Sequence, residues 1–459
     1  MNYGDADPIA ALATPPGESA LAVIRISGNA AVTRLSDVFS RPKALREAPG
    51  NTVIYGWILE DRRKIDETLI SVYRAPRSYT GEDSADISCH GGIAAVRGVL
   101  RVLRTAGFRD ALPGEFTFRA FMNRKLDLTK AESVMELVSA KSDKGRERAV
   151  GRLSGQLEQE IQGIKSLATE VLAGAELFLD YSEDEFSADS DEAAGHLPQR
   201  SLAEAVLARL DALAASYTME RLYQAGALAV LAGRPNAGKS SLFNLLLKED
   251  RAIVADKPGT TRDWIEAWIS LEGLPIRLAD TAGLRDAEDE IERLGVDRTR
   301  SLAEEADVIL YVIDGLQGFT PEDRAFFQEH PDRVIGIWNK IDAAPRPENL
   351  CAGSPYKILG VSAKTGAGIP ELSGAVIPLL TKSSSSASGP GIASERQKVL
   401  LEKARGCIRE ALALADQGQP LDVIAPALRE AVNALGEITG EVSAPDILEV
   451  MFRKFCVGK

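Results

Sequence analysis

The segment LAVLAGRPNAGKSSLFNLL (228–246) decides the fold of the middle of the chain, because it reads as a strand, a glycine-rich loop and an amphipathic helix in succession. Its spacing is Gly233-x4-Gly238-Lys239-Ser240. In this pattern the glycines let backbone amides approach phosphate oxygens, the lysine reaches the terminal phosphates and the serine can ligate Mg²⁺. The N-terminus of the following helix adds a favourable dipole. A chance glycine turn would lack this context, so the segment predicts a nucleotide-binding P-loop.

Three shorter motifs follow in order, each at the end of an apolar strand-like run: DTAG (280–283), NKID (339–342) and SAK (362–364). Asp280 can hold Mg²⁺ through water. The carboxylate of Asp342 can accept hydrogen bonds from the N1–H and the 2-amino group of guanine. Adenine lacks this pair of donors and would leave the acceptor unpaired, so ATP is rejected. The ordered motifs predict a Ras-like G domain that binds GTP.

The sequence defines the groups that hydrolyse GTP less sharply. GTTRD (259–263) lies where a switch loop belongs, and Thr261 is the predicted second Mg²⁺ ligand, with Thr260 as the alternative. Leu284 follows DTAG, where Ras-type enzymes carry a water-positioning glutamine, and leucine cannot orient water. The acidic residues that follow either supply the missing group or form a solvated helix face. They are Asp286, Glu288, Asp289, Glu290 and Glu292.

Composition and charge exclude several classes of protein. With 54 basic and 67 acidic residues among 459, the formal charge is −13, so any contact with nucleic acid needs a local patch or a partner subunit. Cys89, Cys351, Cys407 and Cys456 form no CxxC pair, which favours neither disulfides nor zinc and fits a reducing cytoplasm. The sequence has no signal-peptide pattern and no apolar run near about 18 residues, so no membrane contact is expected.

The chain changes character along its length, which predicts a multidomain protein with α/β and all-α parts. Residues 1–120 read as an α/β domain, 121–222 as the first part of a helical domain, 223–380 as the P-loop G domain and 381–459 as the second helical part. The Ser/Gly-rich linker KSSSSASGPG (382–391) opens this last part. The simplest interpretation is one helical domain into which the G domain is inserted.

Local signals place several elements more closely. Strand-like runs rich in β-branched and aromatic residues are 21–27, 52–59 and 67–75. IAAVRGVLRVLRTAG (93–107) predicts a helix that Gly107 ends. Thr129 and Glu132 have the spacing of a capping box, which predicts a helix that begins at Thr129.

Motifs outside the G domain resemble those of one family. They are IAALATPPG…VIRISG (9–28), SYTGED…ISCHGG (78–92), LPGEFTFRAFMNRKLDLTKAE (112–132) and FCVGK (455–459). A generic GTPase would match the middle of the chain alone, whereas these motifs cover the N-terminal domain and both helical flanks. The whole chain therefore resembles the MnmE (TrmE) family of tRNA uridine-modification GTPases.

The resemblance implies an N-terminal domain that dimerises and binds tetrahydrofolate, and a homodimer that forms a heterotetramer with the FAD-dependent protein MnmG (GidA). Together they would add a (carboxymethyl)aminomethyl group to C5 of the wobble uridine, U34, of certain tRNAs. GTP would be hydrolysed by the G domain, and 5,10-methylene- or 5-formyl-tetrahydrofolate would supply the one-carbon unit. The alternatives are a ribosome-assembly GTPase without folate chemistry and a prenylated membrane switch, whose terminal box Gly458 and Lys459 fit poorly.

The resemblance also assigns residues around the phosphates. Family members bind K⁺ through the P-loop asparagine and the switch loop, which here gives Asn236, Ala255, Lys257 and Thr260. Ala255 and Lys257 replace residue types that are more usual there. The family's catalytic glutamate lies twelve residues after the aspartate of DTAG, at Glu292, where it would orient the attacking water. In all, the residues predicted to bind GTP are Asn236, Ala237, Gly238, Lys239, Ser240, Ser241, Ala255, Asp256, Lys257, Pro258, Gly259, Thr260, Thr261, Asp280, Thr281, Ala282, Gly283, Asn339, Lys340, Asp342, Ser362, Ala363 and Lys364.

The folate site implied by the resemblance would use residues from both ends of the chain. It consists of Arg25, Glu82, Lys125 and Lys459. Cys456 would touch the substrate, act as a nucleophile or serve as a small buried hydrophobe. Arg25 lies in an apolar strand, where a free charge is costly, so its partner is either an ordinary ion pair or the carboxylate tail of folate. Glu82 can pair with the donor edge of the pterin.

Overall fold

The structure, a computed structural model, describes residues 7–180, 197–248, 252–253, 265–280, 304–347, 356–381, 390–441, 448, 451–453 and 455–458. The chain divides into two compact units. The first unit holds Met1–Met135 together with Leu435–Lys459, and the second holds Glu136–Ala434. The domain boundaries that the sequence suggested at 120, 222 and 380 stay predictions.

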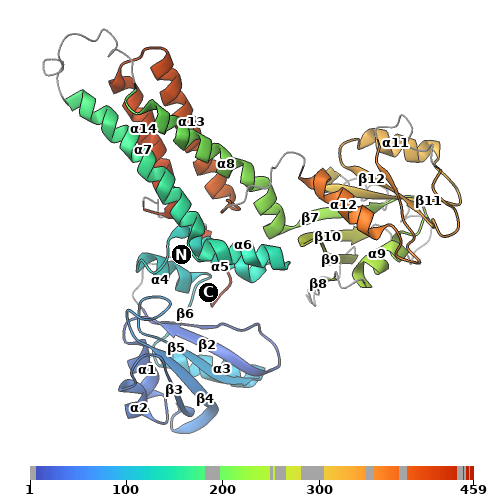
Figure 1. Ribbon diagram of the computed structural model, residues 1–459. Helices are drawn as coiled ribbons and strands as arrows, with labels where there is room; N and C mark the ends of the chain where they lie inside the picture. The colour runs from blue at the N-terminus through green and yellow to red at the C-terminus, as the bar shows by residue number, and fades with distance from the viewer. Residues whose placement is uncertain are drawn as a thin grey trace, which may run out of the picture. The chain divides into compact units, whose positions relative to one another are not determined.

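A six-stranded sheet forms the centre of the first unit (Figure 1). Its strands are β1 (Ile9–Leu12), β2 (Ser19–Ser27), β3 (Thr52–Glu60), β4 (Arg63–Tyr73), β5 (Ser84–Gly91) and β6 (Arg109–Asp110). Their order is β3-β4-β5-β2-β1-β6, and every pair is antiparallel except β1 with β6. Side chains alternate between the two faces of a strand. Ile24, Ile70 and Ile87 therefore lie on one face, where they are fully buried.

Three helices cover this buried face: α1 (Ala31–Asp37), α2 (Pro42–Arg46) and α3 (Ile93–Thr105). Leu35, Leu45 and Val99 come from these helices and belong to the same hydrophobic core as the strand isoleucines. The predicted end of α3 is confirmed, since Gly107 has φ 85° and its amide donates to the carbonyl of Arg104. Glycine adopts this left-handed conformation without steric cost.

Two further helices, α4 (Glu115–Met122) and α5 (Leu128–Ser139), follow the sheet. The predicted start of α5 at Thr129 is wrong. Oδ1 of Asp127 accepts hydrogen bonds from the amides of Thr129 (2.7 Å) and Lys130 (3.2 Å), so the aspartate caps the helix. A carboxylate ahead of the threonine competes for the same free amides and wins them.

The C-terminal segment returns to the first unit through apolar contacts. Leu448, Phe452 and Phe455 share a hydrophobic cluster with Leu128 of α5, and Phe452 is fully buried. The rings of Phe452 and Phe118 meet edge to face with centroids 5.4 Å apart, a favourable geometry for an aromatic pair. This cluster holds the end of the chain beside α4 and α5.

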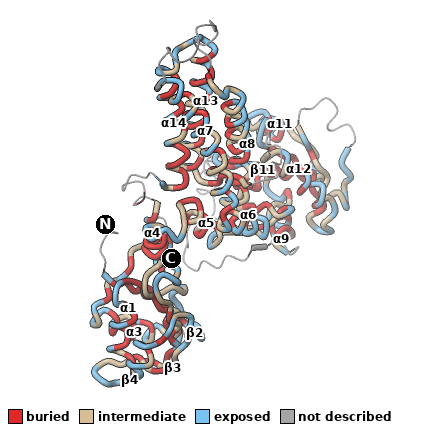
Figure 2. The backbone as a smooth tube through the Cα atoms, turned by 60° about the vertical axis from the view of Figure 1, so that its left-hand side comes forward, coloured by how far each residue is buried: buried red, intermediate tan, exposed pale blue. Residues whose placement is uncertain are grey.

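The helices of the second unit come from both sides of the G domain in sequence. They are α6 (Asp143–Leu153), α7 (Gln156–Asp180), α8 (Arg200–Ala225), α13 (Glu395–Asp416) and α14 (Leu421–Thr439). Helix α8 packs against both α7 and α13, and Figure 2 shows buried residues along the sides that these helices turn to one another. The prediction of a helical domain with an inserted G domain is confirmed. Among the described residues, no helix is both long and apolar enough to span a membrane.

The G domain is built on a seven-stranded sheet in the order β13-β12-β11-β7-β10-β9-β8. The strands are β7 (Ala227–Ala232), β8 (Ala252–Ile253), β9 (Ile265–Leu271), β10 (Leu274–Asp280), β11 (Val308–Asp314), β12 (Val334–Asn339) and β13 (Ile358–Gly360), and the helices are α9 (Lys239–Lys248), α11 (Pro321–Glu329) and α12 (Ile369–Leu380). Strands β7, β10, β11, β12 and β13 are parallel, whereas β9 runs antiparallel to its neighbours.

Strand β7 is the central strand of this sheet and every one of its residues is buried. Leu231 belongs to the core on one face and Val230 to the core on the other, as expected for a parallel sheet covered on both sides. One residue, Gly226, separates β7 from α8; it has φ 76°, and a Cβ there would lie 2.4 Å from the ring of Trp268. Helix α8 of the helical domain and strand β7 of the G domain are thus joined through a single residue.

A buried ion-pair cluster connects α5, α6 and α8 in the second unit. Arg152 pairs with Glu136 at 2.6 Å and with Glu220 at 2.7 Å, and all three side chains are at most 4% exposed. Arg148 also pairs with Glu220 and lies over the ring of Tyr223. Removing one member of such a cluster leaves a buried charge without its partner.

We expect Arg152→Met to lower the free energy of unfolding by about 3–5 kcal/mol, because Glu136 and Glu220 each lose a buried ion-pair partner. Urea unfolding of the whole chain, followed by far-ultraviolet circular dichroism, measures the loss. The matched control is Arg200→Met, which removes two exposed ion pairs and should cost about 1 kcal/mol or less. Equal urea midpoints for the two variants would contradict the prediction.

Candidate functional site

The glycines of the P-loop fit closely against neighbouring strands. Gly233, directly after β7, has φ 130°, and a Cβ there would lie 2.2 Å from the carbonyl oxygen of Val312. Gly238 has φ 99°, and its Cβ would lie 2.2 Å from Nδ2 of Asn339. No other residue fits either position without displacing its neighbours. The loop backbone can therefore come close to an anion at the start of α9, where the helix dipole favours one.

Lys239 and Ser240 begin α9. Nζ of Lys239 donates hydrogen bonds to the carbonyls of Gly233 (2.7 Å) and Arg234 (2.9 Å), which holds the ammonium over the loop. Ser240 and Ser241 occupy the first turn of α9 and are exposed. A hydroxyl and an ammonium thus flank the same helix N-terminus, as phosphate binding requires.

Asn339 ties three of the predicted motifs together from a nearly fully buried position (2% exposed). Its Nδ2 donates to the carbonyl of Ala237 (2.8 Å), and its Oδ1 accepts from the amide of Ala363 (3.0 Å). The adjacent Lys340 donates from Nζ to the carbonyl of Asn236 (3.2 Å) and to Oδ2 of Asp314 (2.8 Å). The P-loop, NKID and SAK segments therefore meet at one edge of the sheet.

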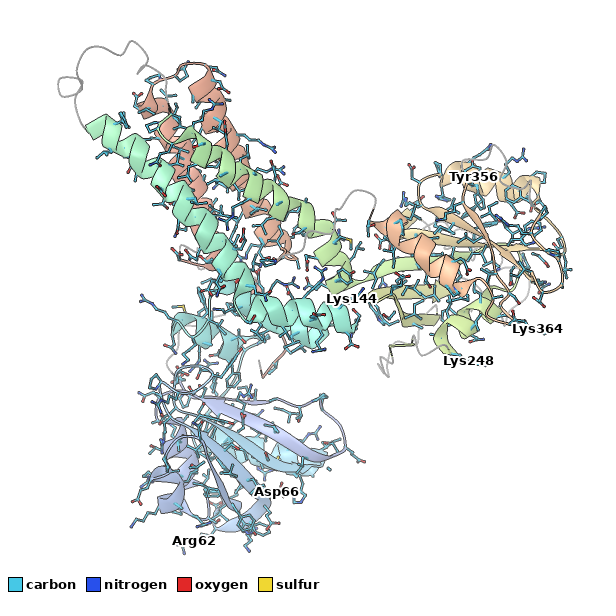
Figure 3. The ribbon with its side chains drawn as sticks, in the orientation of Figure 1. Arg62, Asp66, Lys144, Lys248, Tyr356 and Lys364 are labelled. Carbon is cyan, nitrogen blue, oxygen red and sulfur yellow. The ribbon has the colours of Figure 1, made fainter. Side chains whose placement is uncertain are left out.

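Asp342 and Ser362 form the part of this sheet edge that could recognise the nucleotide base. The Ser362 hydroxyl, fully buried, donates to Oδ1 of Asp342 at 2.6 Å. This hydrogen bond holds the pKa of the Asp342 carboxyl below its usual range, with Lys364 contributing attraction. Lys364 itself is exposed on the surface of the G domain (Figure 3). The carboxylate is thus ionised, and the bond from Ser362 orients it.

Other predicted residues lie outside the described part of the chain. Asp280 is the last residue of β10 and stands in register with Leu231 of β7, close in the sheet to the P-loop, but its side chain is outside the description. The remaining predicted positions outside the described residues are Ala255, Asp256, Lys257, Pro258, Gly259, Thr260, Thr261, Thr281, Ala282, Gly283 and Glu292.

A second polar site lies in the first unit, around Arg25 of β2. Its guanidinium pairs with Asp86 of β5 through Nε–Oδ1 (2.9 Å) and Nη2–Oδ2 (3.2 Å). The ordinary ion pair considered for Arg25 is therefore present. Nη1 of the same group also donates to the carbonyl of Gly458 at 3.4 Å, so the arginine meets the C-terminal tail as well.

The C-terminal tail, residues 455–458, packs closely against β1 and the start of α4. Gly458 has φ 94°, and a Cβ there would lie 2.8 Å from the carbonyl oxygen of Leu12. The amide of Gly114 donates to the carbonyl of Cys456 at 3.3 Å. Cys456 is a free thiol and is exposed, which excludes the buried-hydrophobe alternative. Lys459 lies outside the described residues.

Glu82 and Lys125 complete the set of predicted folate residues. Oε2 of Glu82 accepts from the hydroxyl of Ser27 (2.9 Å) and from Nη1 of Arg119 (3.2 Å). Nζ of Lys125 donates to the carbonyl of Pro76 (2.9 Å) and is exposed. The structure gives no bond between Lys125 and Glu82 or Arg25 among the described contacts; all three belong to the first unit.

Two family models match the chain. The model described as GTP-binding protein TrmE N-terminus matches residues 8–125, and the model of the MnmE helical domain matches residues 128–456. A tRNA modification GTPase MnmE from Treponema denticola is 42% identical over 473 residues, covering 100% of this chain and 99% of that protein. The chain belongs to the MnmE family. A relative of the same name from Geobacillus kaustophilus is 39% identical over 465 residues, covering 99% of each chain.

One solved structure resembles part of this MnmE-family chain. The GTPase Era from Aquifex aeolicus, solved with GDP and aluminium fluoride, is 26% identical, covers 39% of this chain and 66% of that one, and has a TM-score of 0.28. The family assignment rests on the full-length relatives and the two family models.

Sequence reasoning missed several polar partners in this MnmE-family protein. Asp86 is the cross-strand partner of Arg25 in the β2–β5 register. The available signal was an acidic residue in the strand-like run that follows the SYTGED motif. Arg119 and Glu115 lie within a quoted motif but carried no assigned role. Their signal was weaker, because an arginine four residues after a glutamate on a helix is usually a surface pair.

Proposed function

We propose that this member of the MnmE family hydrolyses GTP and acts in the modification of tRNA. The observation that carries the proposal is full-length similarity, at 42% identity, to a protein named tRNA modification GTPase MnmE. The convergence of the P-loop, Asn339, Asp342 and Ala363 at one edge of the sheet supports the GTPase part of the proposal.

Oxygen donors around the P-loop suit the proposed cations. Asn236 and Ser240 are exposed there and carry the amide and hydroxyl oxygens that hard cations prefer. Mg²⁺ would be held by Ser240 and Thr261, with Asp280 acting through water, and K⁺ by Asn236, Ala255, Lys257 and Thr260. When bound, these cations neutralise charge that develops on the phosphates.

We infer that the first unit binds a tetrahydrofolate one-carbon donor through Arg25, Glu82, Lys125 and Lys459. The hydrogen bond from Arg25 to the Gly458 carbonyl supports this inference, because it brings the tail to the predicted arginine. A ribosome-assembly GTPase without folate chemistry gives no reason for this meeting. The enzyme would work in the cytoplasm, without membrane contact, as a homodimer in a heterotetramer with the FAD-dependent MnmG, at C5 of the wobble uridine of tRNA.

Asp342→Asn should exchange guanine for xanthine specificity. The asparagine amide accepts from N1–H but donates toward position 2, where xanthine has a carbonyl and guanine an amino group. Loss of the charged acceptor should weaken GTP binding on the order of 100-fold. In a reconstitution with the FAD partner, a folate donor and tRNA, the variant should modify tRNA with XTP and fail with GTP.

The control for this exchange is Glu371→Gln, which removes an exposed carboxylate from α12 in the same domain and should leave nucleotide choice unchanged. If Asp342→Asn binds GTP and XTP with wild-type affinities, the assignment of Asp342 to guanine is wrong.

Glu292→Ala should keep GTP affinity and lower the turnover of GTP by roughly 100-fold or more, the scale of one water-positioning role. Single-turnover hydrolysis in K⁺ measures the loss, and Glu288→Ala and Glu290→Ala are the matched controls. If turnover falls in either control while Glu292→Ala is unaffected, the water-positioning role belongs to that control residue and not to Glu292. Replacing K⁺ by Na⁺ should slow the wild type, and equal rates would remove the cation from the proposal.

Gly458→Ala should weaken the binding of 5-formyltetrahydrofolate. The left-handed backbone costs a residue with a Cβ about 1–2 kcal/mol, and the methyl group would press on the Leu12 carbonyl, so the tail should shift away from Arg25. A loss of about 5- to 30-fold in affinity corresponds to this cost and can be measured by isothermal titration. Gly406→Ala in α13, where a Cβ meets nothing within 4 Å, is the control. Unchanged affinity in Gly458→Ala would exclude the tail from the folate site.

A further inference from the structure

Arg119 of α4 lies beneath the proposed folate site and bridges two carboxylates. Its Nη1 is 3.2 Å from Oε2 of Glu82, and its Nη2 is 2.9 Å from Oε1 of Glu115. Nη2 also donates to the carbonyl of Asp7 at 2.8 Å. The Arg119 side chain is 6% exposed and that of Glu82 is 26% exposed, so the arginine supports the glutamate from the protein interior.

Glu115, at one end of this bridge, is held in place by contacts that do not involve Glu82. Glu115 is fully buried and accepts two hydrogen bonds from Arg109, at 2.6 and 2.8 Å, and a third from the amide of Leu112 at 2.8 Å. Burial alone would raise the pKa of Glu115, but these bonds and those from Arg119 hold it below the usual range. Glu115 is therefore a fixed anion that orients the Arg119 fork.

At the other end of the bridge, one oxygen of Glu82 is strongly bonded and the other can accept further donors. Oε2 accepts from Arg119 and from the hydroxyl of Ser27 at 2.9 Å, and that hydroxyl is itself 2.6 Å from Oγ1 of Thr80. Among the described contacts, Oε1 has only a long one, 3.4 Å from the same Nη1. Gly28 leaves the necessary room, because a Cβ there would lie 3.2 Å from Nη1 of Arg119.

We propose that Arg119 is a positioning residue of the folate site, which holds the Glu82 carboxylate so that Oε1 accepts hydrogen bonds from the donor edge of the ligand's amino-pyrimidinone ring. The proposal rests on the folate-binding function proposed above. It assigns the ligand class more narrowly than charge alone does, since a ring without the 2-amino group keeps only its lactam N–H and gains less from an oriented carboxylate. Arg119 acts through Glu82 and does not itself touch the ligand.

The test compares Arg119→Gln with Arg109→Gln in the full-length protein by isothermal titration with 5-formyltetrahydrofolate. Both variants remove a guanidinium from Glu115, but only Arg119 also reaches Glu82. We expect at least a tenfold loss of affinity for Arg119→Gln and less than a threefold loss for Arg109→Gln. Similar losses in both variants would overturn the proposal, because they would show that the arginines merely stabilise Glu115.

Two further measurements separate positioning from folding. In a Glu82→Gln background, Arg119→Gln should cost less than a further twofold, and a full additional loss would overturn the proposal. A folate analogue with a methyl group in place of the 2-amino group keeps only the lactam N–H. The difference in its affinity between the wild type and Arg119→Gln should therefore be smaller than for 5-formyltetrahydrofolate, and an equal or larger difference would overturn the proposal.

The outcomes also separate this proposal from the function on which it rests. If Glu82→Gln itself binds 5-formyltetrahydrofolate as the wild type does, the folate assignment of Glu82 fails, and the role of Arg119 fails with it. If Glu82→Gln weakens binding and Arg119→Gln does not, only the positioning role fails. Should Arg119→Gln not fold, Arg119→Lys keeps a charge beside Glu115, and its unchanged folate affinity would overturn the proposal.

Discussion

The burial of two C-terminal aromatic side chains against α5 is the constraint on which the domain arrangement depends. Phe452 is fully buried and Phe455 nearly so, and burying each such side chain contributes about 1.5–3 kcal/mol. Because the end of the chain is anchored in the unit where the chain begins, the intervening residues must leave that unit and return. On the way back the second helical stretch packs against the first, as α13 does against α8, and the G domain lies between the two stretches in sequence.

The same anchoring explains how residues at the C-terminal end come to lie beside Arg25 of the N-terminal sheet. Residues 456–458 follow directly after Phe455, and their path is fixed by contacts with Gly114, Leu12 and Arg25. In the G domain, Asn339 has the corresponding role, since its buried amide joins loops that are far apart in sequence. In both places a few polar contacts join segments that lie far apart in the sequence.

Local patterns in the sequence predicted the parts of the molecule that local physics controls. The strand–loop–helix context of the P-loop and the glycine after α3 required no knowledge of distant contacts. Prediction failed where two local solutions competed, as when Asp127 displaced Thr129 as the cap of α5. It also failed where the partner came from another strand, as with Asp86 beside Arg25. The bridge through Arg119 depends on side-chain reach across a core, which spacing along the chain does not encode.

The turn at Gly226 has a mechanical consequence. Helix α8 has 26 residues, and at about 1.5 Å per residue it is about 39 Å long. Helix α8 meets β7 through Gly226 alone, which packs against Trp268. The connection between the helix and the strand that carries the P-loop is therefore short and closely packed. A rotation of about 10° about Gly226 would move the far end of a helix of that length by about 7 Å. The length of α8 thus sets how far its N-terminal end would travel for a given change of angle at Gly226.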